Sequence, residues 1–208
     1  MNKASSHYKL DIKSLLERAN SATKLNFAVI IRCVFIVLFI FLISTSIYLQ
    51  VFNIETMQDL ELLQTETYYF NMILVVVLAP LWAGIAMLSV KTERKQAVNT
   101  LTLFSYIRMS LSLGIAALCI SLLTQIGMTL ILPAIYLFIT TIFSKLLIAD
   151  KNMNPFVAIK TSIQIANKHL LQLTMVFVIF FIAALVLGTL TFGLAFIWIT
   201  PLYYNATG

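Results

Sequence analysis

Charged residues are scarce in this sequence: only 11% of its 208 residues are Asp, Glu, Lys or Arg, whereas 61% are apolar. A soluble domain carries about 25% charged and about 45–50% apolar residues. Too little polar surface is therefore available to cover a water-soluble globular protein, and the same apolar content excludes an intrinsically disordered chain. With a mean hydropathy of +0.96, the composition indicates an integral membrane protein.

Glycine, proline and cysteine are also rare. Six glycines and four prolines exclude a collagen-like chain. The two cysteines, Cys33 and Cys119, both fall in apolar stretches, so the sequence predicts neither a disulfide nor a metal site from them. Enzyme motifs are missing as well, because no Walker loop and no HExxH, CxxC, GxSxG or DxDxDG pattern occurs. We therefore predict no catalytic residue, no cofactor and no metal, and we expect the protein not to be an enzyme.

Long apolar runs fill most of the chain, and a helix that crosses the bilayer needs about 20 such residues. Residues 27–49 carry Arg32 as their only charge and contain sixteen Ile, Leu, Val or Phe residues, which favour insertion by about 5–10 kcal/mol. Residues 107–148 would make one helix of about 63 Å, twice the hydrocarbon thickness of about 30 Å, so they must fold back at the polar segment 124–127. The final run divides in the same way at 188–193. The six predicted spans are residues 27–49, 71–90, 107–124, 128–148, 170–187 and 190–206.

The last two predicted spans are short, so a re-entrant final segment is the alternative to a sixth crossing. The predicted domains are a cytoplasmic amphipathic N-terminal helix over residues 1–26 and a six-helix transmembrane domain over residues 27–208.

Basic residues alternate along the chain with segments that have none. The segments with Lys or Arg are residues 1–32, 91–108 and 145–168, and those without are 33–90, 109–144 and 169–208. By the positive-inside rule, both termini and the loops 91–106 and 149–169 are predicted to be cytoplasmic. Topology thus accounts for the net charge of +6, and we predict no nucleic-acid partner. Anionic phospholipid is the expected partner of these basic loops, at up to about 1 kcal/mol per residue.

The loop 50–69, predicted to face outward, is acidic. Its carboxylates could offer ligands to a hard cation. Met57, Leu60 and Leu63 are interleaved with them, however, so we interpret the carboxylates as the solvent-exposed face of a short helix. The acids are Glu55, Asp59, Glu61 and Glu66.

An amphipathic helix is predicted over residues 155–168. Asn154 is a good N-cap and Pro155 suits the first helical position. The apolar half, which contains Ala158 and Ser162, should lie against the cytoplasmic ends of the spans, with these two small residues closest to another helix, near Tyr136 or Tyr203. Lys160 and Lys168 occupy the other half. Residues 8–22 show a similar pattern, and residues 93–106 show a weaker one.

A proline recurs in the second helix of each predicted hairpin: Pro80, Pro133 and Pro201. We interpret the chain as three parallel units, each a cytoplasmic amphipathic helix followed by a hairpin. The alternative is that any protein with an even number of spans and amphipathic loops has this pattern. The predicted fold class is therefore an all-α membrane protein whose six transmembrane helices form three hairpins, each preceded by a cytoplasmic amphipathic helix.

Close helix packing is predicted where small residues are four apart, because close backbone approach favours helix association in a bilayer. We expect these residues to join helices within the chain rather than to form a dimer interface. The pairs are Ala79 with Ala83, Ser110 with Gly114, and Ala117 with Ser121, and Pro80 with Gly84 adds a kink.

Residues 107–208 resemble the YciC-like family of uncharacterised bacterial inner-membrane proteins, related to the membrane domain that precedes some glycerophosphodiester phosphodiesterases. The resemblance implies six helices, a bacterial inner (cytoplasmic) membrane location and no established chemistry. The family usually continues past its last tyrosine, whereas this sequence stops at Gly208. The matching motif residues are Leu132-Pro133-Ala134-Ile135-Tyr136, Asn154, Pro155, Ala158, Ser162, Asn167, Lys168, Gly188, Gly193, Pro201, Tyr203 and Tyr204.

Arg32 is the ionisable residue placed well inside a predicted span, and it can either snorkel to the interface or pair with a polar group of another helix.

Two functions fit the sequence: a non-catalytic module that associates with lipid or a membrane-protein partner, and a permease for a lipid-like or weakly polar molecule. A connected polar cavity at mid-membrane would favour the permease. The structural or interaction candidates are Arg32, Pro80, Pro133, Tyr136, Ala158, Ser162, Asn167, Lys168, Pro201 and Tyr203.

Overall fold

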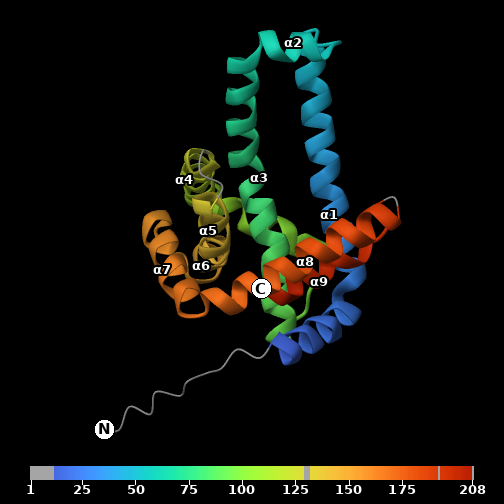
Figure 1. Cartoon of the computed structure of the whole chain (residues 1–208), viewed down its shortest axis with the longest axis vertical. Helices are drawn as coiled ribbons and strands as arrows, with labels where there is room; N and C mark the ends of the chain where they lie inside the picture. The colour runs from blue at the N-terminus through green and yellow to red at the C-terminus, as the bar shows by residue number, and fades with distance from the viewer. Residues whose placement is uncertain (1–11, 129–131, 192, 208) are drawn as a thin grey trace.

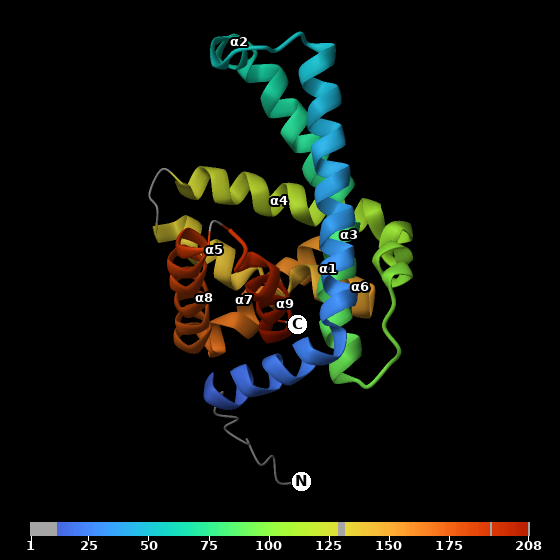
Figure 2. The same cartoon turned by 90° about the vertical axis from the view of Figure 1, so that its right-hand side faces the viewer.

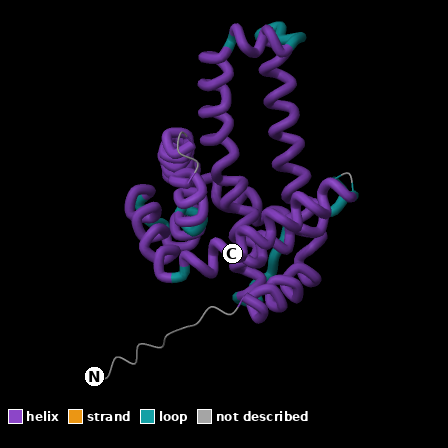
Figure 3. The backbone as a smooth tube through the Cα atoms, in the orientation of Figure 1, coloured by secondary structure: helices purple, strands orange, loops and turns teal. Residues whose placement is uncertain are grey.

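The computed structural model describes residues 12–128, 132–191 and 193–207, and it is helical along nearly all of them, with no strand in these ranges (Figure 3). The all-α prediction is confirmed. The helices are α1 (Ile12–Val51), α2 (Met57–Leu62), α3 (Gln64–Glu93), the 3-10 helix η1 (Thr100–Met109), α4 (Ser110–Met128), α5 (Leu132–Thr140), α6 (Ser144–Lys151), α7 (Pro155–Lys168), α8 (Leu170–Leu190) and α9 (Phe196–Thr207).

Helices α1 and α3 form a long hairpin whose far end projects beyond the other helices (Figure 1). The short helix α2 connects them at that end, as the pattern of the acidic loop predicts. The Thr56 hydroxyl accepts a hydrogen bond from the Asp59 backbone N–H, while the Asp59 carboxylate accepts from the Thr56 backbone N–H. This capping box and the Glu55 N–H hold the pKa of Asp59 below its ordinary value.

Helix α3 is the most buried helix, and small residues let its neighbours approach it closely. Ala83 is fully buried. A Cβ atom on Gly84 would lie 2.5 Å from the carbonyl oxygen of Leu103 in η1, and one on Gly114 of α4 would lie 2.7 Å from Val76 Cγ1. The prediction that small residues join helices within the chain is confirmed at Gly84 and Gly114, whereas Ala117 and Ser121 line a cavity instead.

The predicted amphipathic helix over residues 93–106 is wrong. Helix α3 ends at Glu93, and Lys95 then takes a left-handed backbone conformation with φ of 55°, which a helix cannot continue through. The chain becomes helical again only after Asn99, whose side-chain oxygen accepts the backbone N–H of Thr102 at 3.0 Å. The ten-residue helix η1 that follows is longer than the three to four residues usual for a 3-10 helix.

The predicted boundary at residue 26 falls inside α1. Residues 12–26 and the first predicted span form one continuous helix of 40 residues, because no glycine or proline interrupts this segment. Figure 2 shows the N-terminal part of α1 turned against the remainder. Residues 8–11 of the predicted amphipathic helix lie outside the described residues.

Five helical segments are long and apolar enough to cross a membrane, judged by length and composition: 12–51, 64–93, 100–128, 132–151 and 170–190. The sixth predicted span corresponds to α9, which has only 12 residues. Figure 2 also shows α4 lying across α1 and not alongside it, so a bundle of three regular hairpins is not what the structure displays.

The fourth segment is interrupted between α5 and α6. Thr140 Oγ1 donates to the Tyr136 carbonyl at 2.8 Å, and Thr141 Oγ1 donates to that of Leu137 at 2.7 Å. Such bonds to the preceding turn bend a helix. The chain accordingly forms a turn at residues 141–143 before α6 begins at Ser144.

Candidate functional site

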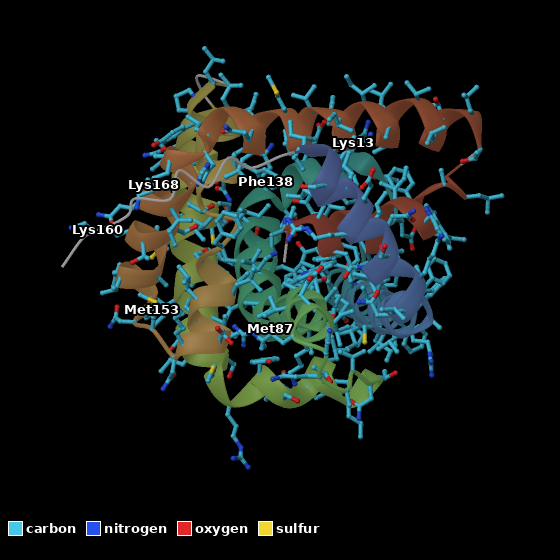
Figure 4. All side chains as sticks on the ribbon, turned by 90° about the horizontal axis from the view of Figure 1, so that it is seen from below. Lys13, Met87, Phe138, Met153, Lys160 and Lys168 are labelled. Atoms are coloured by element: carbon cyan, nitrogen blue, oxygen red, sulfur yellow. The ribbon has the colours of Figure 1, made fainter. Side chains whose placement is uncertain are left out.

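Helix α7 has the bounds that the sequence predicts, Pro155–Lys168, and Asn154 caps it by accepting the Phe156 N–H at 3.1 Å. Ala158 and Ser162 are fully buried. Ser162 Oγ donates to the Thr140 carbonyl of α5 at 2.7 Å, so these small residues do face another helix. Figure 4 shows Lys160 and Lys168 at the outer edge of the molecule, and both are exposed.

Helix α5, which packs against α7, carries Tyr136, one of the two positions predicted for this contact. Its hydroxyl donates to Asn167 Oδ1 at 3.0 Å. Tyr203 is elsewhere, on α9, where its ring meets Phe180 edge-on with centroids 5.5 Å apart. The structure therefore brings Tyr136, Ser162 and Asn167 together in one contact and leaves Tyr203 out of it.

The remaining predicted residues do not converge on one site. Arg32 is exposed, and its Nε donates to the Ala28 carbonyl of its own helix at 3.0 Å. Pro80 and Pro201 are buried inside α3 and α9, whereas Pro133 is exposed near the start of α5. Lys168 ends α7.

A cavity of about 610 Å³ lies between helices α1, α3, α4, α5, α6 and α9. Its wall is mostly apolar. Among the predicted site residues, Tyr203 lines it. The lining residues are Val37, Leu38, Phe41, Asn71, Leu74, Val75, Leu78, Ala79, Trp82, Leu113, Ala116, Ala117, Ile120, Ser121, Phe138, Thr141, Ile142, Ser144, Lys145 and Tyr203.

Lys145 is the charged residue in the wall of this cavity. It follows the first residue of α6, so the turn between α5 and α6 sets its position. Its Nζ lies 5.9 Å from the ring centroid of buried Tyr204, which stacks on Trp82 with centroids 6.5 Å apart. Among the residues that the structure describes, no hydrogen bond or ion pair to Lys145 is found.

The hydroxyl groups next to Lys145 are engaged with the backbone. Thr141 donates to Leu137, and Ser144 Oγ donates to the Thr141 carbonyl at 2.6 Å. The Ser121 hydroxyl, across the cavity on α4, accepts from Gln125 Nε2 at 3.3 Å. Lys145 is therefore the charged donor among the described lining residues, beside the uncharged donor groups of Asn71, Trp82 and Tyr203.

From the sequence, Lys145 is only the basic end of a predicted span, and its place in the cavity is not predicted. A signal was present, because apolar residues 146–148 follow Lys145 directly and keep it inside the apolar run. An ionisable residue in such a run is a functional candidate by default. The contact of Lys145 with Tyr204 of α9, however, depends on the tertiary structure.

A second group of polar side chains is buried between α1, α3 and α9. Asn26 Nδ2 donates to Asn205 Oδ1 at 3.1 Å and to Thr92 Oγ1 at 2.9 Å. Asn205 Nδ2 donates in turn to Asn26 Oδ1 and Thr23 Oγ1, both at 3.0 Å. These mutual bonds satisfy the two amides and fix the end of α9 against α1.

No group of three or more His, Cys, Asp or Glu side chains that could hold a metal ion occurs within the described ranges. Cys33 and Cys119 are both free thiols. No protein-family model matches the chain, and no curated protein or solved structure matches it either. The cavity and the residues around it are therefore the basis for a functional assignment.

Proposed function

We propose that this protein is a multi-pass membrane protein that binds a lipid-like molecule in the cavity beside α3 and performs no catalysis. The observation that carries the proposal is the mostly apolar cavity of about 610 Å³. Sites for small molecules typically measure about 300–1,000 Å³ and have mainly apolar walls with a few polar groups. An apolar wall in a membrane protein suits a molecule that is itself dissolved in the bilayer.

The surface of the helices supports a membrane location. Large apolar side chains are exposed along α1 and α8, where water contact would be unfavourable and lipid contact would not. Examples are Phe35, Phe39, Leu42, Phe181 and Ile182, which are 54–64% exposed.

Two contacts support a topology with both termini on the cytoplasmic side. The bonds among Asn26, Thr92 and Asn205 join the start of the first span, the end of α3 and the end of α9. Arg94 and Asp150 form a bidentate ion pair that joins the loop after α3 to the end of α6. All of these segments are predicted to be cytoplasmic. The acidic helix α2 lies at the opposite end of the hairpin (Figure 1).

The sixth crossing, the bacterial inner membrane and membership of the YciC-like family belong to this proposal as well. The family and the membrane rest on the sequence motifs of residues 107–208. The sixth crossing rests on α9, which returns the chain to Asn26 although its 12 residues measure about 18 Å. A re-entrant final segment is the alternative that this short length supports.

A permease is the second candidate, because Pro80 and Pro201 lie inside two helices that line the cavity. Interrupted helices line the sites of many transporters. The cavity wall is mostly apolar, however, and carries no carboxylate among its lining residues. Lipid binding therefore fits the cavity better than transport coupled to ions does.

Native mass spectrometry of the protein released from membranes in mild detergent tests lipid binding. Ala117 lines the cavity, so Ala117→Trp should fill part of it and reduce the amount of co-purified lipid. Leu111 is on the same helix and is 77% exposed, so Leu111→Trp is the matched control and should retain the lipid. Equal lipid in both variants would contradict the proposal. Uptake of the bound molecule into sealed proteoliposomes would favour the permease instead.

A further inference from the structure

We propose that the ligand of this cavity is an amphiphile with one apolar chain and a negatively charged head group, and that Lys145 binds the head group. This inference rests on the proposed function, since it names the class of molecule that the same cavity takes. Four observations support it: the unpaired ammonium, the engaged hydroxyls of Ser121, Thr141 and Ser144, the distribution of carboxylates and the mostly apolar remainder of the wall.

The ammonium group of Lys145 lacks an anion. An ammonium has three N–H donors, and half-buried Lys145 is partly removed from water, where a charge is unfavourable unless it is paired and hydrogen-bonded. The ring of Tyr204, at 5.9 Å from Nζ, lies at the outer limit of a cation–π contact and accepts no conventional hydrogen bond. A ligand anion would supply both the charge and the acceptors.

Among the described residues, no carboxylate is available to pair with Lys145. Asp150 is the acid nearest in sequence, and Arg94 binds both of its oxygens, at 2.5 and 2.8 Å. The other described acids lie on α1 (Glu17), in or beside α2 (such as Glu55 and Glu66) or at the end of α3 (Glu93), and none of them pairs with Lys145. A counter-ion for Lys145 would therefore come from outside the described residues.

The apolar remainder of the cavity wall favours a ligand with one hydrocarbon chain. Val37 and Leu78 are buried side chains from α1 and α3, and Leu113 and Phe138 face the same space from α4 and α5. The cavity volume of about 610 Å³ is in the range of sites for single small molecules. Tyr203 also lines the cavity, and no hydrogen bond of its hydroxyl is found among the described residues, so it is a second donor for the head group.

The two natural sources of such a head group are a carboxylate, as in a fatty acid, and a phosphate, as in a single-chain phospholipid. Both present several oxygen acceptors to an ammonium. The ammonium of Lys145 is a compact point charge, so it can bind either head group. It does not need the two parallel hydrogen bonds that the planar guanidinium of arginine forms with an anion. The chemistry common to both sources is thus a compact anion at the end of an apolar chain.

Trp82 lines the cavity and provides a direct signal for binding. The sequence has one other tryptophan, Trp198, which is 46% exposed and is replaced by Phe in all samples. The protein in non-ionic detergent is titrated with 9,10-dibromostearate, whose bromine atoms quench a nearby indole, and in parallel with the uncharged methyl ester of the same acid. Hexadecyl phosphate and hexadecylamine are then used as competitors.

Both brominated compounds should quench Trp82, and hexadecyl phosphate should displace the acid whereas hexadecylamine should not. Lys145→Met should weaken binding of the acid about tenfold or more, because a hydrogen bond to a charged group is lost. The methyl ester should bind this variant within about twofold of the wild type, which also shows that the cavity is intact. Lys145→Arg should retain binding of the acid.

The possible failures are distinguishable. If Lys145→Met binds the acid as tightly as the wild type, the cavity takes lipid but Lys145 does not select anions, and this inference is overturned. If neither brominated compound quenches Trp82 in the wild type, the proposed function fails and the inference fails with it. Should Lys145→Met not fold, Lys145→Gln replaces it, and undiminished acid binding by that variant would equally overturn the inference.

Discussion

Helices α3 and η1 approach each other closely at Gly84, and Gly84→Ala tests that contact. The added Cβ would lie 2.5 Å from the Leu103 carbonyl oxygen and 2.9 Å from its Cα. Both are backbone atoms, so no rotation of a side chain can relieve the clash. Helix η1 would have to move away from α3, and with it fully buried Leu103.

The expected magnitude is the difference of two effects. Alanine stabilises a helix interior by about 0.5–1 kcal/mol relative to glycine. Overpacking typically costs about 1–3 kcal/mol, and a contact with rigid backbone belongs at the upper end of that range. We therefore expect Gly84→Ala to lower the free energy of unfolding by about 2 kcal/mol.

Gly114→Ala is the matched control. Its Cβ would lie 2.7 Å from Val76 Cγ1, which is a side-chain methyl group that a change of rotamer can move. Its stability should therefore stay within about 1 kcal/mol of the wild type. Thermal unfolding in detergent, followed by tryptophan fluorescence, would compare the two variants. A Gly84→Ala protein at least as stable as the wild type would refute the close approach of α3 and η1.

Three further changes test other parts of the structure. Ala158→Leu should lower the melting temperature in detergent much more than Lys160→Ala, because position 158 is fully buried and position 160 is exposed; the reverse order would indicate that α7 is a partner- or lipid-binding surface. Asn205→Ala should lower the free energy of unfolding by about 1–3 kcal/mol, because it leaves buried partners in α1 unsatisfied, and a melting temperature equal to that of the wild type would argue against the polar cluster. Single cysteines at Thr65 and Asn152 should differ in reaction with an impermeant maleimide added outside intact cells, with labelling at position 65 alone; labelling at position 152 would overturn the proposed topology.

Local sequence alone determined several features of this protein. Its composition is that of a membrane protein and its helices follow the apolar runs, because these properties depend on residue type and not on neighbours in space. Helix α7 has its predicted bounds because Asn154 and Pro155 act within one turn of the chain. The acidic loop forms the short helix α2 for the same reason, through Thr56 and Asp59.

Tertiary structure decided what sequence patterns could not. Helix α3 ends at Glu93, and Lys95 then takes a left-handed backbone conformation that no sequence motif predicts. Helix η1 packs on α3 because Gly84 leaves room for Leu103. The cavity depends on helices distant in sequence, and the place of Lys145 in its wall depends on α9 bringing Tyr204 to α6. Hydrophobicity is non-directional, so it specifies which residues leave water and not which helices meet.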